Sequence, residues 1–210
     1  MVEEQLVNRR IKDLRILEAM GRVPRHLFVA EALRHKAYGD HPLPIGENQT
    51  ISQPYMVGLM TQALRLNERD KVMEIGTGCG YQTAILAELA EQVFTIERIK
   101  PLSQEAEKCL GRLDYQNVVY RICDGTYGWR DQAPYDAILI AAAMPQIPKS
   151  FIGQLKDRGR LVAPVGPTPD RQRLTLLTKN GENITTRSIA DCKFVPLIGK
   201  YGWPETLEEG

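Results

Sequence analysis

The chain has 210 residues, of which 43% are hydrophobic and 25% are charged, close to the averages for soluble globular proteins. This length suits one hydrophobic core, and the composition excludes a disordered, collagen-like or disulfide-dense protein. The 27 Lys and Arg residues nearly balance the 26 Asp and Glu residues, leaving a net charge of +1. Overall charge therefore gives no reason to expect a nucleic-acid or anionic-lipid partner.

The cysteines and the N-terminus indicate the cellular environment. Four cysteines, at positions 79, 109, 123 and 192, show no Cys-x-x-Cys spacing and no neighbouring histidine. We therefore predict separate reduced thiols and no metal. The N-terminus carries several charges and lacks an apolar run long enough for a signal peptide or membrane span, so we expect a cytoplasmic protein.

The first third of the chain contains two predicted helices separated by a loop. Apolar residues recur at steps of three and four over residues 6–20, which predicts an amphipathic helix ending at Gly21 and Pro24. Residues 37–53 are rich in Gly, Pro, Asp and Asn and show no periodicity, so we predict an ordered loop or lid. A second helix starts near Pro54, whose fixed φ suits a first turn.

From residue 71 onward, short apolar runs alternate with helical stretches. The predicted strands are residues 71–75, 92–96, 118–123 and 135–141, and the predicted helices are 81–89 and 101–113. This βαβ pattern predicts an α/β fold with a doubly wound, mostly parallel sheet, Rossmann-like, whose ligands bind at the carboxyl ends of the strands.

The remainder of the chain is predicted to complete the sheet. A helix at residues 149–155 precedes a strand at 160–164. Two further segments, 174–178 and 184–189, flank Asn180-Gly181, a strong hairpin signal. The sheet should therefore finish with an antiparallel pair.

A glycine-rich segment after the first of these strands carries the main functional signal. It follows Glu74 and consists of Gly76, Thr77, Gly78, Cys79 and Gly80. A dinucleotide-binding turn needs its third glycine at position 81, where this chain has Tyr81, so a nicotinamide cofactor fits poorly. Alternating glycines instead suit a loop around the amino-acid end of S-adenosylmethionine. A plain tight turn remains the alternative for the glycines alone.

Acidic residues at the next two strand ends extend this pattern. Glu97 ends the second strand, where a carboxylate can accept hydrogen bonds from both ribose hydroxyls. Asp124 follows the third strand and is placed to orient the adenine amino group, while Gly125 leaves space for the ring. Each residue alone also fits an ordinary strand end or Asp-Gly turn. Together they predict one adenosyl-binding pocket.

The segment from Pro44 to Pro54 resembles the signature loop of the protein-L-isoaspartate (D-aspartate) O-methyltransferases, and the Thr50-Ile51-Ser52 part is its discriminating element. The resemblance extends over nearly the whole chain, and the Gly-x-x-Gly-Trp ending at residues 199–203 is similar to the bacterial branch. Other matching segments are residues 23–25, 28–29, 74–80, 124–129, 133–138, 154–156, 159–162, 164–166 and 194–197.

This resemblance implies a repair enzyme with one methyltransferase domain over residues 1–210. Residues 1–70 would form N-terminal helices and a substrate loop, 71–166 the cofactor-binding core, and 167–210 the C-terminal strands. The implied reaction methylates the free α-carboxyl of L-isoaspartyl residues in damaged proteins and peptides, with S-adenosylmethionine as donor and S-adenosylhomocysteine as product. The ester then closes to a succinimide, whose hydrolysis returns some normal aspartyl linkage.

Within the resemblance, Ser52 takes the family's active-site position, where its hydroxyl would orient the substrate carboxylate or stabilise the closed loop. A helix cap near Pro54 is the alternative role for Ser52. We expect Thr50, Ile51, Gln53 and Pro54 to shape the same wall. The segment Val195, Pro196, Leu197 and Ile198 would either bind the substrate peptide through its backbone or form a buried terminal strand.

Several alternatives stay open at this point. The chain departs from the family pattern at Asn48, Cys79, Cys123 and Arg158, which affects loop details and cofactor affinity. A methyltransferase for another small-molecule or protein carboxylate shares the same cofactor loop. A non-catalytic adenosyl-binding protein would bind cofactor without turnover. We expect a monomer that acts on damaged protein and uses neither nucleic acid nor membrane.

Overall fold

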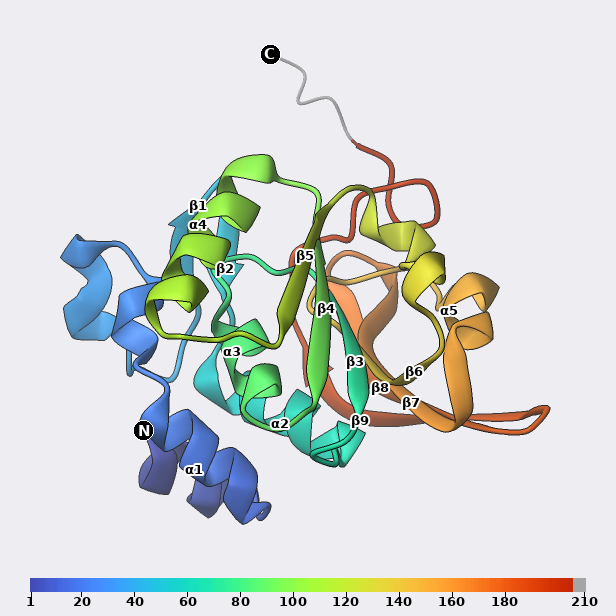
Figure 1. Ribbon diagram of the computed structural model, residues 1–210, viewed down its shortest axis with the longest axis horizontal. Coiled ribbons are helices and arrows are strands. Elements are labelled where there is room, and N and C mark those ends of the chain that lie inside the picture. The colour runs from blue at the N-terminus through green and yellow to red at the C-terminus, as the bar shows by residue number, and fades with distance from the viewer. Residues whose placement is uncertain (206–210) are drawn as a thin grey trace.

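The computed structural model describes residues 1–205 and is built on a seven-stranded sheet (Figure 1). The strand order is β5-β4-β3-β6-β7-β8-β9. The strands from β5 to β7 are parallel, whereas β8 and β9 are antiparallel. Their bounds are β3 Lys71–Ile75, β4 Gln92–Glu97, β5 Val118–Ile122, β6 Tyr135–Ile140, β7 Leu155–Thr168, β8 Arg171–Asn180 and β9 Asn183–Cys192. The predicted fold class and its terminal antiparallel pair are confirmed.

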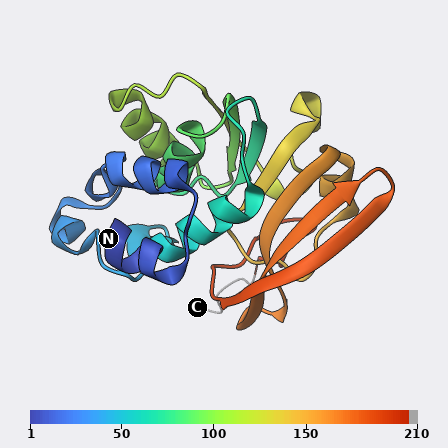
Figure 2. The same cartoon turned by 90° about the horizontal axis from the view of Figure 1, so that it is seen from below.

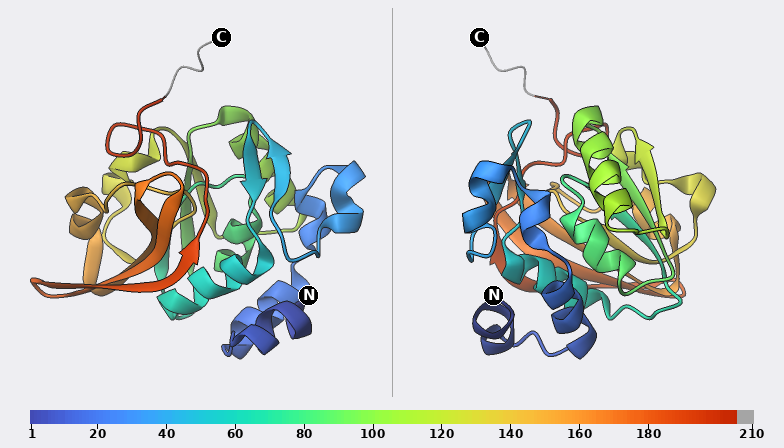
Figure 3. Two further views of the ribbon diagram at one scale, coloured as in Figure 1. Left: turned by 180° about the vertical axis from the view of Figure 1, so that it is seen from behind. Right: turned by 60° about the vertical axis from the view of Figure 1, so that its left-hand side comes forward.

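Helices cover both faces of this sheet because its central strands are apolar on both sides. On β3, Val72 belongs to the hydrophobic cluster under α1 to α4, and Met73 belongs to the cluster under α5. The right-hand view of Figure 3 shows α3 and α4 on the same side of the sheet. The helices are α1 Leu14–Arg22, α2 Pro54–Leu64, α3 Tyr81–Ala87, α4 Lys100–Arg112 and α5 Lys149–Gly153.

The β8–β9 hairpin extends the sheet on its far edge (Figure 2). Asn180 pairs with Asn183, and Gly181 in the turn has a φ of 59°. The hairpin predicted from Asn180-Gly181 is therefore present. The division into three segments stays a prediction; β7 continues to Thr168, past the expected boundary at residue 166.

The prediction of one continuous helix over residues 6–20 is wrong. The chain forms a π-turn (Val2–Leu6) and a 3₁₀ turn (Val7–Arg9), and Arg10 then adopts a left-handed conformation with φ 70°. Helix α1 starts only after Asp13, whose side chain accepts a hydrogen bond from the N–H of Arg15. Tertiary packing explains the break, because the Gln62 side chain of α2 accepts hydrogen bonds from the N–H groups of residues 12 and 13.

Residues 37–53 are also more regular than predicted. They contain a two-stranded antiparallel sheet of β1 (Leu43–Gly46) and β2 (Gln49–Ile51). Glu47 and Asn48 form its turn with φ values of 52° and 54°. Positive φ at both central residues is the geometry of a tight hairpin turn, and Asn tolerates it better than most side chains.

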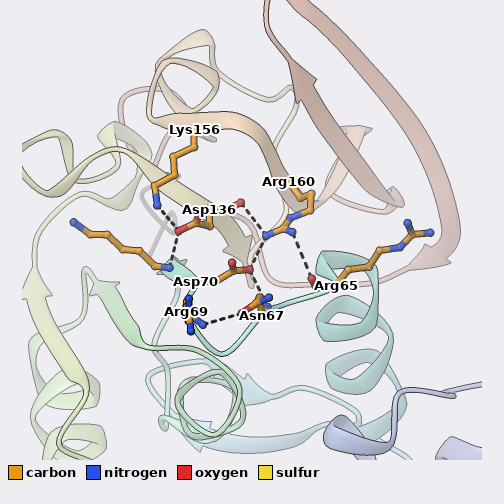
Figure 4. Close-up of polar contacts among 8 residues, drawn as sticks. Arg65, Asn67, Arg69, Asp70, Asp136, Lys156 and Arg160 are labelled. Carbon is orange, nitrogen blue, oxygen red and sulfur yellow. Dashed lines mark hydrogen bonds and ion pairs between the residues drawn. The ribbon is translucent and has the colours of Figure 1, made fainter.

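The amino ends of β3, β6 and β7 are joined by a polar network (Figure 4). Arg160 of β7 donates to Oδ2 of Asp70 across 2.7 Å and contacts the carbonyl oxygen of Asp136 at 3.3 Å. The Asp136 carboxylate also accepts from the Lys71 N–H and from the Lys156 ammonium. The network lies at the opposite end of the strands from the glycine-rich loop. We therefore expect it to stabilise the sheet rather than to bind a ligand.

The structure of residues 1–205 also bears on the state of the cysteines and on membrane-spanning helices. All four cysteines are free thiols. Over residues 1–205, no helix has both the length and the apolar character needed to cross a bilayer.

Candidate active site

A cavity of about 430 Å³ opens at the carboxyl ends of the parallel strands. Its lining residues come from the β1–β2 hairpin with Ser52, from α2, from the glycine loop and the start of α3, from the ends of β3, β4, β5 and β6, and from C-terminal residues 195–198 and 205. The strand order reverses between β3 and β6, which is where a doubly wound sheet forms its ligand crevice. Topology therefore brings together loops that are up to about 150 residues apart in sequence.

The glycine loop has a backbone that only glycine adopts easily. Gly76, Gly78 and Gly80 have φ values of 94°, 54° and 91°. A Cβ atom on Gly80 would lie 3.1 Å from Leu110 and 3.2 Å from Ala106, so this glycine also lets the loop pack closely on α4. Gly76, Thr77, Gly78 and Cys79 line the cavity, whereas Gly80 lies outside the lining residues. At Gly76 and Gly78 the loop thus presents backbone without a side chain to a ligand.

Glu97, at the end of β4, lies beside this loop and lines the cavity. Its Oε2 accepts a hydrogen bond from the N–H of Gly78 at 2.9 Å, and its Oε1 accepts one from the N–H of Ile99 at 3.0 Å. Each carboxylate oxygen has two lone pairs, so both oxygens can accept a further bond from a ligand hydroxyl. The geometry suits the predicted contact with a ribose.

Asp124 and Gly125 follow β5, the next strand. Gly125 lines the cavity, and a Cβ there would lie 2.6 Å from Ile75, so no larger residue fits. The Asp124 carboxylate points elsewhere: Oδ1 accepts from the N–H and hydroxyl of Thr126, and Oδ2 from the N–H of Lys200. Asp124 thus fixes the C-terminal turn beside the cavity, and its contact with adenine stays a prediction.

Glu74 lies behind the glycine loop rather than in the cavity wall. Its side chain is fully buried and accepts hydrogen bonds from the hydroxyls of Thr83 and Thr95 through Oε2. Burial raises the pKa of Glu74 to about 8, and the nearby Glu97 contributes in the same direction. The Thr95 hydroxyl also lies 2.6 Å from the hydroxyl of Thr77, which lines the cavity. Glu74 is therefore connected to the cavity wall through the hydroxyls of Thr95 and Thr77.

Only some of the predicted substrate-loop residues line the cavity. Thr50, Ile51 and Ser52 line the same cavity as the glycine loop. Gln53 and Pro54 do not, since the Gln53 amide donates to the carbonyl of Asp40 and Pro54 is buried in the first turn of α2. The capping alternative for Ser52 is wrong, because Gln53 is the N-cap residue and no side chain caps this helix.

The C-terminal segment contributes all four predicted residues, 195–198, to the wall. It runs parallel to the chain after β6: the N–H of Ala143 donates to the carbonyl of Val195, and the N–H of Leu197 donates to the carbonyl of Ala143. Leu197 also accepts from the N–H of Trp203. Neighbouring residues of an extended chain point their polar groups to opposite sides, so Pro196 and Ile198 direct theirs away from this pairing.

Sequence reasoning missed several lining residues. Ala141 and Ala142 follow β6, and Tyr81 and Gln82 begin α3. The rule that ligands bind at the carboxyl ends of parallel strands would have found the two alanines. Others lie in the signature loop or at strand ends but are not among the predicted contacts: Ile45, Asn48, Gln49, Ile75, Ile96, Arg98 and Ile99. Val57 and Glu205 carry no sequence signal. No group of three or more His, Cys, Asp or Glu side chains within residues 1–205 is arranged to hold a metal.

A doubly wound sheet with a left-handed glycine loop and an acidic residue on the adjacent strand defines an α/β fold that binds a nucleotide-containing cofactor at its strand ends. Among family models, the one described as Protein-L-isoaspartate(D-aspartate) O-methyltransferase (PCMT) matches residues 1–202. The chain belongs to this family.

Curated relatives and a solved structure that resemble this chain carry the same family name. Protein-L-isoaspartate O-methyltransferase 1 of Syntrophobacter fumaroxidans is 55% identical over 205 residues, covering 97% of this chain and 94% of the relative. The corresponding Syntrophus aciditrophicus protein is 56% identical with the same coverage. A solved protein-L-isoaspartate O-methyltransferase superposes with a TM-score of 0.87 at 26% identity, covering 96% of this chain and 67% of that one.

A second solved structure shows the same fold. It is a putative enzyme of this name from Plasmodium falciparum, in complex with S-adenosyl-L-homocysteine, with a TM-score of 0.80 at 24% identity. The match covers 94% of this chain and 96% of that chain. The family and the fold anticipated from the Thr50-Ile51-Ser52 loop and the glycine segment are thus confirmed.

Proposed function

We propose that this enzyme transfers a methyl group from S-adenosylmethionine to the free α-carboxylate of L-isoaspartyl residues in damaged proteins and peptides. One observation supports the proposal: Ser52 and the glycine loop after β3 both line a single cavity. A methyl donor on one wall and a carboxylate on the other would then meet inside it.

The residues present fit the cofactor. Gly76 and Gly78 offer backbone without side chains, Glu97 offers a carboxylate with free lone pairs, and Gly125, which packs closely on Ile75, lines the cavity without a side chain. S-adenosylmethionine supplies a methyl group on a positively charged sulfur. Thr77, Gly78 and Glu97 would hold its amino-acid and ribose parts, and residues around Gly125 its adenine.

The acceptor requires little chemical help from the protein. A carboxyl group with an ordinary pKa of about 4 is already ionised at neutral pH, so no general base has to remove a proton. The protein's contribution is to align the carboxylate and to exclude water from the cavity. Ser52 is the residue we assign to orienting that carboxylate, because it lines the wall and takes the active-site position that the family resemblance implies.

The segment at residues 195–198 would bind the substrate backbone. Among residues 1–205, neither the carbonyl of Pro196 nor the N–H of Ile198 makes a hydrogen bond within the protein. A peptide strand added along this edge would pair with both groups. Backbone pairing tolerates different side chains, which suits an enzyme that must act on many damaged sequences.

The test compares two synthetic peptides that differ only in one residue, L-isoaspartyl or L-aspartyl. We expect radiolabelled methyl transfer to the isoaspartyl peptide and release of the label as methanol in mild base, as for an ester. Equal labelling of both peptides would favour another carboxyl methyltransferase. Binding of S-adenosylhomocysteine without any transfer would favour a non-catalytic protein.

The remaining expectations are separate from this test. We propose that the enzyme acts as a monomer in the cytoplasm, on protein substrates and without nucleic acid. Size-exclusion chromatography with light scattering checks the first point, and a mass near 47 kDa, about twice the 23.7 kDa of one chain, would contradict it.

A further inference from the structure

Arg25 is a charged residue in an unusual place. Its side chain is completely buried, although arginine is among the residues least often found inside proteins. Among residues 1–205, no carboxylate forms an ion pair with it, and its Nη1 has no hydrogen-bond partner. A buried, unpaired charge is costly, so a role beyond packing is needed to explain it.

The two hydrogen bonds that Arg25 does make join segments around the active site. Its Nε donates to the carbonyl of Ala37 and its Nη2 to the carbonyl of Ser52, both at 2.7 Å. A guanidinium is a planar fork with donors in fixed directions, so these two bonds define the position of one carbonyl relative to the other. The backbone of Ser52 is thereby held from behind the cavity wall.

Arg25 also contacts the cofactor side of the cavity. Its guanidinium carbon lies 4.7 Å from the ring centre of Tyr81, which lines the cavity and begins α3 directly after the glycine loop. Arg25 itself is not a lining residue. It therefore lies between the substrate loop and the start of α3 and touches both without reaching a ligand.

We propose that Arg25 is a positioning residue, which holds the Ser52 carbonyl and so sets the place of the Ser52 hydroxyl relative to the methyl donor. The assignment rests on the proposed function. Small displacements matter in this type of reaction, because a shift of about 1 Å in a reacting group can cost on the order of 100-fold in rate. Loss of the Arg25 bond would therefore lower kcat even though Arg25 touches no substrate.

The experiment is a double-mutant cycle of Arg25→Met and Ser52→Ala, followed as kcat with a saturating isoaspartyl peptide. Methionine fills a similar space but donates no hydrogen bond. In the wild-type background we expect Arg25→Met to lower kcat by about 30-fold or more. In the Ser52→Ala background the same change should lower kcat by less than about 3-fold, because the hydroxyl it positions is gone.

The control is Arg22→Met on the neighbouring helix, since Arg22 is exposed and only pairs with Glu88 at the surface. We expect its kcat to stay within about 2-fold of wild type. Affinity for S-adenosylhomocysteine should also stay within about 3-fold in Arg25→Met, which separates misplacement of Ser52 from general unfolding. If the methionine variant does not fold, Arg25→Lys replaces it in the cycle, because one ammonium cannot reproduce the fork.

The outcomes separate the two proposals. Full activity of the Arg25 variant, or equal rate losses with and without Ser52, overturns the assignment of Arg25. A wild-type enzyme that does not methylate the isoaspartyl peptide overturns the proposed function, and the assignment of Arg25 with it. Coupling of about 10-fold or more between the two substitutions supports the assignment.

Discussion

The backbone N–H of Gly78 donates a hydrogen bond to the Glu97 carboxylate, and this bond ties the glycine loop to the end of the neighbouring strand. Because Ile99 donates to the other oxygen of the same carboxylate, Glu97 organises the cavity wall before any ligand arrives. The residue proposed to bind the ribose thus also shapes the loop that we propose binds the amino-acid part of the cofactor.

Replacement of Glu97 by Gln should weaken cofactor binding. An amide carries an NH₂ group where a carboxylate carries an oxygen, so one of the two backbone donors would face another donor. We expect the Kd for S-adenosylhomocysteine, measured by calorimetry, to rise by about 10- to 100-fold, which corresponds to roughly 1.4 to 3 kcal/mol. The matched control is Glu91→Gln, an exposed residue one position before β4, which should bind as wild type does.

Substitution of Ser52 by Ala should affect catalysis and spare the cofactor. We expect kcat with the isoaspartyl peptide to fall by about 10-fold or more, with the Kd for S-adenosylhomocysteine within about 2-fold of wild type. Ser188→Ala, on the exposed edge strand β9, is the control for loss of a serine hydroxyl. Unchanged kcat in the Ser52 variant would remove this residue from the active site.

Glu74 predicts a pH dependence of stability. Its pKa is raised from 4.5 to about 8 in the fold, so the native state binds more protons than the unfolded state between these values. The stability that protonated Glu74 contributes is therefore fully present below about pH 4.5 and is lost as pH rises toward 8.

Glu74→Gln should remove this dependence, because the amide is neutral throughout. In urea unfolding, we expect the free energy of unfolding of the variant, relative to wild type, to increase between pH 5 and pH 8 by on the order of 2 to 3 kcal/mol. A constant difference across this range would show that Glu74 titrates normally in the native protein.

Two glycine-to-alanine substitutions should have opposite effects. Gly80→Ala forces a side chain into a left-handed backbone and against Leu110, and we expect a loss of about 1 to 3 kcal/mol. Gly111→Ala, in helix α4, places its Cβ in open space and should stabilise the protein by about 0.5 to 1 kcal/mol. Thermal and urea unfolding measure both. Similar changes in the two variants would contradict the close packing at residue 80.

The network at the amino ends of the strands should affect stability without affecting the site. Arg160→Met leaves the Asp70 carboxylate, whose side chain is only 12% exposed, without its ion pair. We expect a loss of about 2 kcal/mol, partly recovered in the Arg160→Met/Asp70→Asn double variant. Affinity for S-adenosylhomocysteine should not change, and a large loss of affinity would connect this network to the site.

The sequence predicted the parts of the site that depend on local pattern. The glycine loop, Glu97 and Gly125 follow apolar runs with strand character, and the topology of a doubly wound sheet then places them together. Glu74 and Asp124 share the same pattern but have their carboxylates bound to Thr83, Thr95, Thr126 and Lys200. Strand-end position predicts where a residue lies and does not predict which partner its side chain finds.

The family, the sheet and the order of the predicted binding loops could be predicted without coordinates, because the signature loop, the hydrophobic period and the glycine spacing are local properties of the chain. The structure added three features: the break at Arg10, the burial of Arg25 behind Ser52, and the local hairpin within residues 37–53, whose strands are too short to show a period. The break and the buried arginine depend on partners far away in sequence, such as Gln62 for residues 12 and 13 and Ser52 for Arg25, and on whether a buried polar group finds a hydrogen bond.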